Sequence, residues 1–242
     1  MLVVLGLSLG RSAVYSVLSL ADKLTKEVPL AQQTTSINTS ATPERPWLDL
    51  AYQLANLVFP LMPVALVFYL MWVWQRPHGG PFRRMGCDLR RPGFDLGVGS
   101  LVFAGIGAGG ILLYLAAREL GFNTTVAAAN LAEAWWTIPV LVLRAVMNGV
   151  LEEVVMVGYL FTRWRQAGGR TATVLVGSAL IRGAYHLYQG FGGFAGNLIM
   201  GLLFGWLYLR TKRVMPLVVV HSLLDIAAFV GYALLKPHLS WL

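Results

Sequence analysis

Seven apolar runs, each near the length of about 20 residues that an α-helix needs to cross a bilayer, dominate this chain. They lie at roughly residues 2–20, 50–74, 96–117, 138–162, 173–189, 192–209 and 215–235. Hydrophobic residues make up 57% of the 242-residue chain and charged residues only 12%, which excludes an ordinary soluble domain. The sequence therefore predicts an all-α fold, a polytopic transmembrane helix bundle of about seven spans that crosses the lipid bilayer of the cell membrane.

Basic residues indicate how the helices are oriented. Arg and Lys cluster in every second loop, whereas the loops between these clusters hold few for their length. The positive-inside rule places the basic loops in the cytoplasm, so we expect a cytoplasmic N-terminus. The same rule explains the net charge of +8. Because the basic residues form no continuous face, we expect no nucleic-acid partner.

The expected outer segment from Gln32 to Pro46 is rich in Thr, Ser and Asn and contains two prolines. Such a composition offers little apolar surface to bury. The sequence therefore predicts a flexible loop without a core of its own.

Three pairs of glycines have the GxxxG spacing that lets membrane helices approach each other closely. The pairs are Gly105 with Gly109, Gly192 with Gly196, and Gly201 with Gly205. We expect all three pairs to lie at contacts between helices.

Ionisable side chains interrupt three of the apolar runs. Glu152 and Glu153 lie in the fourth run, His186 in the fifth and His221 in the seventh. A charged group at the bilayer centre costs roughly 2.5–3.5 kcal/mol on insertion scales, so such groups usually line a functional cavity. At about 1.5 Å per residue from the cytoplasmic helix ends, the three helices carry these groups at similar depths of roughly 12–18 Å. We therefore expect them to converge around one pocket.

Neighbouring polar residues add partners to this group. Arg144, Asn148 and Glu152 follow one another at intervals of four, so they line one stripe of the fourth helix. Glu153 lies about 100° further round the helix, so we expect one glutamate to face a cavity while the other braces it. Glu152 beside a neutral His186 would form a pair able to take a proton from water.

The interval of four recurs in two later helices, between His221 and Asp225 and between Arg182 and His186. A carboxylate one turn away can hold an imidazole in one tautomer, so we expect Asp225 to orient His221. The structural alternative is that these polar groups only form hydrogen bonds between helices, which stabilise the bundle by about 0.6 kcal/mol each. Five groups at matched depth exceed what such joining needs.

Three segments resemble the motifs of a known family of membrane peptidases. They are Glu152-Glu153-Val154-Val155-Met156-Val157, Tyr185-His186-Leu187 and His221-Ser222-Leu223-Leu224-Asp225. In order and spacing they resemble EExxxR, FxxxH and Hxxx(N/D) of the CAAX-protease and bacteriocin-processing (CPBP, or Abi) intramembrane peptidases. The resemblance covers residues 135–235, which we expect to be the catalytic core. Residues 1–134 would supply N-terminal transmembrane helices and loops of the same single membrane domain.

The resemblance implies an intramembrane endopeptidase, a hydrolase whose site opens toward the cytoplasm. Its substrate would be a membrane-associated protein or peptide, such as a prenylated CAAX protein. Glu152 and His186 would activate the attacking water, and Glu153 would support the site. His221 and Asp225 would stabilise the oxyanion. The family is viewed as glutamate-dependent, so no metal or other cofactor is expected.

Two residues depart from the family pattern. Val157 stands at the position of the motif arginine, and Arg182 stands at the position of the motif phenylalanine. Since an isolated buried carboxylate is unstable, we expect Arg182 to replace the missing cation and neutralise a glutamate of the neighbouring helix. Arg182 and Asn148 are thus the expected supporting residues of the site.

Three other functions fit the sequence less well. Zinc held by the histidines and a glutamate is an alternative chemistry, although the chain has no HExxH motif. The altered first motif leaves open a catalytically inactive member of the family that serves as a membrane scaffold or immunity-type protein. Ion transport is a third class because ionisable groups in spans also mark ion pathways, but the chain has no internal repeat.

Overall fold

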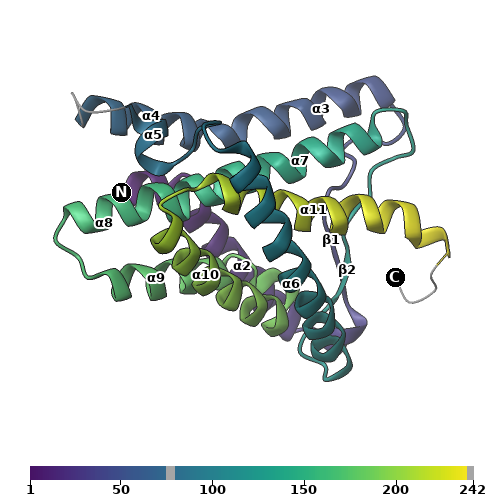
Figure 1. Ribbon diagram of the computed structural model, residues 1–242. Coiled ribbons are helices and arrows are strands. Elements are labelled where there is room, and N and C mark those ends of the chain that lie inside the picture. Colours follow the sequence, from purple (N-terminus) through teal and green to yellow (C-terminus); the bar gives the residue numbers. More distant parts are fainter. Residues whose placement is uncertain (75–79, 239–242) are drawn as a thin grey trace.

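The apolar runs form helices in the computed structural model, which describes residues 1–74 and 80–238 (Figure 1). A helix satisfies its backbone hydrogen bonds within the segment, so an apolar run in this form can face lipid. Several helices begin with a proline in the first turn, as at Pro46, Pro92 and Pro216. The missing N–H of proline is harmless there because the first N–H groups of a helix have no partner within it.

The helical elements, in chain order, are α1 (Leu2–Gly6), α2 (Leu9–Leu24), η1 (Leu30–Gln32), α3 (Pro46–Val58), η2 (Phe59–Leu61), α4 (Met62–Trp74), α5 (Pro81–Met85), α6 (Pro92–Glu119), α7 (Thr137–Glu152), the π-helical η3 (Glu153–Tyr159), α8 (Leu160–Gln166), α9 (Thr171–Ala184), η4 (Leu187–Gln189), α10 (Phe191–Thr211), α11 (Met215–Leu235) and η5 (Lys236–His238). The strands are β1 (Thr34–Ser36) and β2 (Thr125–Ala127).

Four helical stretches in the described part of the chain are long and apolar enough to cross a bilayer. They are Pro46–Val73, Pro92–Glu119, Phe191–Thr211 and Met215–Leu235. Together with the near absence of strands in the described residues, they confirm the expected all-α membrane helix bundle. The count of seven spans and the cytoplasmic N-terminus remain predictions.

The other three expected spans are helical but interrupted. The first is divided into α1 and α2, and the fourth runs through α7, η3 and α8 with a change of winding. The fifth ends at Ala184, five residues before its expected end at residue 189. The chain then turns through η4 and Gly190, whose φ of +116° suits glycine alone.

The core is built where α11 packs between α7 and α6 and where α10 packs against α9. Figure 1 shows α7 and α11 running side by side through the middle of the molecule. Glycine permits the closest of these contacts. A Cβ on Gly149 of α7 would lie 2.7 Å from the Ser222 hydroxyl of α11, and one on Gly99 of α6 would lie 2.4 Å from Val219.

Two of the three GxxxG pairs lie at helix contacts as expected. A Cβ on Gly192 would lie 2.4 Å from Ala117 of α6, and one on Gly205 would lie 2.4 Å from Leu175 of α9. The expectation was wrong for the pair on α6. A Cβ on Gly105 or Gly109 meets no atom within 4 Å among the described residues, because this side of α6 faces outward.

The segment from Gln32 to Pro46 is ordered, which corrects the expected flexible loop. Its strand β1 pairs in parallel with β2, with Thr35 opposite Val126. The Asn38 side chain is buried and donates to the carbonyl of Ala128 at 2.9 Å. Arg144 of α7 donates to Asn38 Oδ1 at 3.1 Å. Polar side chains thus hold this segment by hydrogen bonds, which a composition argument based on apolar burial does not foresee.

Candidate active site

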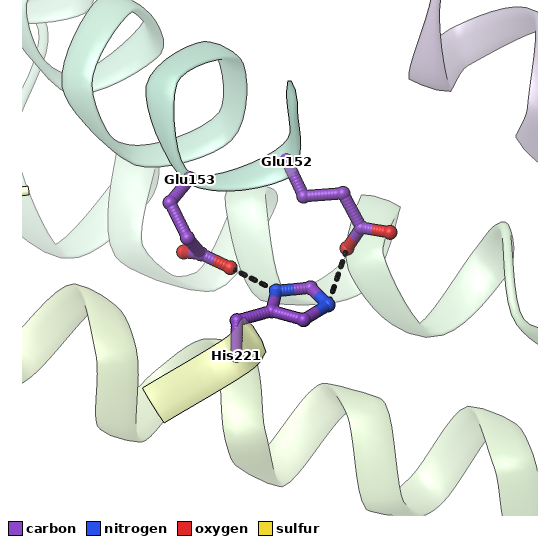
Figure 2. Close-up of side chains that lie close together, drawn as sticks. All are labelled: Glu152, Glu153 and His221. Atoms are coloured by element: carbon purple, nitrogen blue, oxygen red, sulfur yellow. Dashed lines mark hydrogen bonds and ion pairs between the residues drawn. The ribbon is translucent and has the colours of Figure 1, made fainter. Parts of the chain in front are cut away.

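The two adjacent glutamates lie where one long helix changes its winding. Glu152 is the last residue of α7, and Glu153 begins the π-helical segment η3. π-Helical turns are rare in proteins overall, but those that do occur are often found at functional sites. Ser178 of α9 donates to the carbonyl of Met156 inside this segment at 3.2 Å. Figure 2 shows the two carboxylates reaching His221 of α11 from opposite sides of the imidazole.

Glu153 is the braced member of the pair. It is fully buried, and its Oε1 accepts hydrogen bonds from Arg182 Nη2 and from His221 Nδ1, each at 2.6 Å. Arg182 is fully buried as well, so this ion pair is shielded from water. Because a carboxylate only accepts, the bond to His221 assigns a proton to Nδ1 of that ring.

Glu152 is the accessible member of the pair. Its Oε2 accepts a hydrogen bond from the Tyr185 hydroxyl at 2.6 Å and lies 3.6 Å from Arg182 Nη1. The same oxygen is 3.9 Å from His221 Nε2. The Glu152 side chain is 12% exposed, whereas that of Glu153 is 0% exposed. One carboxylate can therefore meet a water molecule while the other cannot.

Asp225 lies beside His221 but does not set its tautomer, which differs from the expectation. Asp225 Oδ1 is 3.9 Å from His221 Nε2, beyond hydrogen-bond distance, whereas Glu153 bonds directly to Nδ1. Asn148 of α7 donates to Asp225 Oδ2 at 2.9 Å, so this expected supporting residue is part of the group. The sequence could not rank the two carboxylates because Glu153 comes from another helix.

The open side of the group consists of Glu152, Asp225 and the Nε2 edge of His221. The Asp225 side chain is 21% exposed, so polar atoms of two helices face an accessible space. A water molecule or a peptide carbonyl placed there would meet both a carboxylate base and an imidazole.

His186 lies beyond the end of α9, which corrects its expected place within that helix. Since α9 ends at Ala184, the ring makes a local contact in which Nδ1 is 3.0 Å from the carbonyl of Arg182. No hydrogen bond or ion pair joins His186 to Glu152 among the residues that the structure describes. The carbonyl accepts, so Nδ1 carries the proton and Nε2 is left as an acceptor. The ring lies against Tyr185, with centroids 4.7 Å apart.

Arg182 forms the ion pair expected from the altered motifs. It contacts Glu153 at 2.6 Å and Glu152 at 3.6 Å, and its guanidinium carbon is 5.2 Å from the ring centre of Phe204. Val157 is buried within η3 among apolar side chains. A cation from the neighbouring helix thus lies against the glutamates, while the motif position on their own helix is apolar.

Two features of the site escaped the sequence analysis. Tyr185 belongs to the second motif segment but had no assigned role, although its hydroxyl holds Glu152. A signal was present, since a tyrosine in an apolar span needs a partner for its hydroxyl. The π-helical winding of η3 had no such signal, because hydrophobic periodicity cannot distinguish one π-helical turn from the α-helical turns around it.

The same residues offer a donor set for a metal ion. One ligand atom each of Glu152, Glu153 and His221 lie within 4.8 Å of one another. However, Glu153 Oε1 already accepts from both Arg182 and His221, and the guanidinium is 3.6 Å from Glu152. A divalent cation here would lie beside a buried positive charge, so the group fits a metal poorly.

A protein-family model matches part of the chain. The model of the family described as type II CAAX prenyl endopeptidase Rce1-like matches residues 134–227. That segment begins just before α7 and ends within α11, so it contains all seven residues that the sequence analysis assigned to the site. Searches of curated proteins and of solved structures found no match.

Proposed function

This chain belongs to the CPBP family of membrane proteases, and from that premise we propose that it is an intramembrane glutamate-dependent endopeptidase. Its substrate would be a membrane-associated protein or peptide, and a prenylated CAAX-type C-terminus is the form that the matching family suggests. The observation that carries the proposal is that the two adjacent glutamates differ in their access to water. Glu152 is reachable by water, whereas Glu153 is buried under Arg182 and His221.

In the proposed reaction Glu152 takes a proton from a water molecule whose oxygen attacks the scissile carbonyl carbon. The acceptor Nε2 of His186 orients that water. His221 acts in its imidazolium form, in which Nδ1–H donates to Glu153 and Nε2–H is left to donate to the oxyanion. When the C–N bond breaks, the proton held by Glu152 passes to the leaving amine. The products are a free carboxylate and a free amine.

Asp225 and Arg182 act around this centre rather than on the water. Asp225, held by Asn148, lies on the Nε2 side of His221 and stabilises the positive ring. Arg182 balances the charge of the two adjacent glutamates, which otherwise repel each other. The role that the family pattern gives to a cation is thus supplied from α9.

The proposal is tested by cleavage of a prenylated CAAX peptide in membranes that contain the Glu152→Gln variant. Glutamine keeps the size of the side chain but cannot take a proton, so turnover should fall by at least about 100-fold. Glu133→Gln is the matched control, since Glu133 is exposed and outside the site. Turnover at the wild-type rate by Glu152→Gln would contradict the proposal and favour a scaffold.

A chelator distinguishes the zinc alternative in the same assay. The buried guanidinium beside the glutamates leads us to expect unchanged turnover after the chelator is added. Turnover that is lost with the chelator and restored by added zinc would instead assign a metal to Glu152, Glu153 and His221.

A further inference from the structure

A pocket of about 490 Å³ lies at the end of the bundle where α8 and α10 finish. It shares no residue with the candidate active site. Residues from three separate elements line it: Arg84 of α5, Arg165 of α8, and Lys212, which caps α10. In Figure 1, α5 and α8 lie at the same side of the molecule. The volume of the pocket is within the usual range for small-ligand sites, about 300–1,000 Å³.

The charge of this pocket is one-sided. Three cationic side chains converge on it, and no acidic side chain is among the described residues that line it. An anionic group placed among these three cations is attracted to all of them. The pocket therefore suits an anionic group.

The backbone and the apolar floor give the pocket a defined shape. Lys212 adopts a left-handed conformation with a φ of +57°, uncommon for a residue with a side chain, and its N–H donates to the Tyr208 carbonyl at 2.7 Å. Tyr208 packs edge-on against Phe161, with ring centroids 5.8 Å apart. The three cations and these two aromatic side chains thus line the same pocket.

The position of the pocket along the spanning helices indicates which kind of anion it would meet. Trp206, one turn before the end of α10, is 51% exposed, and Arg210 lies 5.5 Å from the centre of its ring. Exposed tryptophans on spanning helices mark the level of the lipid headgroups. The pocket is beside this level, where phosphodiesters of lipids are concentrated. Basic pockets between membrane helices are known to bind such headgroups.

We propose that the pocket of Arg84, Arg165 and Lys212 is a binding site for the phosphate of an anionic phospholipid. The phosphate lies between the three cations, and the glycerol backbone lies over the floor of Tyr208 and Phe161. The bound lipid joins the ends of α5, α8 and α10, and so stabilises the helix that carries the two glutamates. This site is independent of the catalytic proposal.

The test is the thermal stability of the purified protein in detergent, with phosphatidylglycerol added in steps. We expect the melting temperature to rise by several degrees and to saturate, whereas phosphatidylcholine gives little change. The Arg165→Ala, Lys212→Ala double variant should lose the rise. The matched control is Arg170→Ala, Lys26→Ala, which removes the same two kinds of charge from exposed positions outside the pocket and should keep the rise.

Two further arms make the result decisive. Equal melting temperatures of the double variant and the wild type in phosphatidylcholine show that the variant is folded. If inorganic phosphate alone raises the melting temperature saturably and as much as phosphatidylglycerol does, the pocket binds a free phosphate ion. That result would overturn the proposal of a lipid. An undiminished rise with phosphatidylglycerol in the double variant would overturn the site itself.

Discussion

Residue 182 is an arginine where the related motif has phenylalanine, and residue 157 is a valine where it has arginine. The structure explains why these departures are compatible with an intact site. Arg182 reaches Glu153 at 2.6 Å from the neighbouring helix, so the buried carboxylate keeps a cationic partner. A cation at position 157 would enter the apolar core around η3, where Val157 is almost fully buried.

Arg182→Ala should abolish turnover and lower stability. Removing one partner of a buried ion pair typically costs about 3–5 kcal/mol, because the other charge is left without compensation. Arg182→Lys should retain part of the activity, since it keeps the charge but not the forked geometry. The measurement is turnover per folded protein, with Arg170→Ala as an exposed control. Full activity of Arg182→Ala would show that the glutamates need no cation from α9.

At the scale of elements, the short helix η4 connects the end of α9 to the start of α10 and carries the chain onward from His186. The N-terminal helix α2 holds this connection from outside residues 134–227, which match the family model. Tyr188 N–H donates to Ser16 Oγ at 2.7 Å, and Lys23 Nζ donates to the Tyr188 carbonyl at 2.8 Å. Thr124 binds the next carbonyl, that of Gln189, at 2.9 Å. Segments outside the motif region thus determine where His186 lies.

Ser16→Ala should reduce kcat with little change in KM. The substitution leaves the Tyr188 N–H without its acceptor, so the connection next to His186 loses one restraint. A hydrogen bond of this kind contributes about 0.5–1.5 kcal/mol, which corresponds to a reduction of roughly 2- to 10-fold. Ser12→Ala on the same helix is the matched control because Ser12 bonds only to its own helix. Equal kcat values for the two variants would show that the contact of Ser16 with Tyr188 does not contribute to turnover.

At the scale of the whole molecule, Arg213 joins the loop before α6, the first turn of α6 and the start of α11. It binds Asp95 through two nitrogens, each at 2.7 Å, and Asp88 at 3.0 Å. Burial disfavours the charged form of Asp88, but hydrogen bonds from the Arg90 N–H and from Arg213 outweigh it and hold its pKa below the usual value. This link fixes α11, and with it His221, against α6.

The lowered pKa of Asp88 predicts an acid-sensitive contribution to stability. A depressed carboxyl pKa stabilises the fold fully above the unfolded value of about 3.9, and the contribution is lost as pH falls through the folded pKa. We expect the melting temperature in detergent to fall below about pH 4 in the wild type. Asp88→Asn should start lower and fall less steeply over that range. Identical pH profiles of the two proteins would exclude Asp88 as a source of this stability.

The sequence alone determined the class of the fold and pointed to most of the residues that lie together in the candidate site. Continuous apolar runs of about 20 residues favour helices, because a helix of that length crosses a bilayer and satisfies its backbone groups within the segment. Charged groups in such runs are costly, which is why Glu152, Glu153 and His221 were expected to converge. These conclusions depend on local composition and on spacing along one helix, which a sequence states directly.

Only the tertiary structure decided which carboxylate faces water and which partner each group has. Glu153 rather than Asp225 holds His221, and α9 ends before His186, because both outcomes depend on how helices far apart in the chain pack. The polar segment from Gln32 to Pro46 became ordered for the same reason, since β1 gained a partner in β2. Contacts between distant segments are set by packing and hydrogen bonding in three dimensions, and periodicity along the chain carries no record of them.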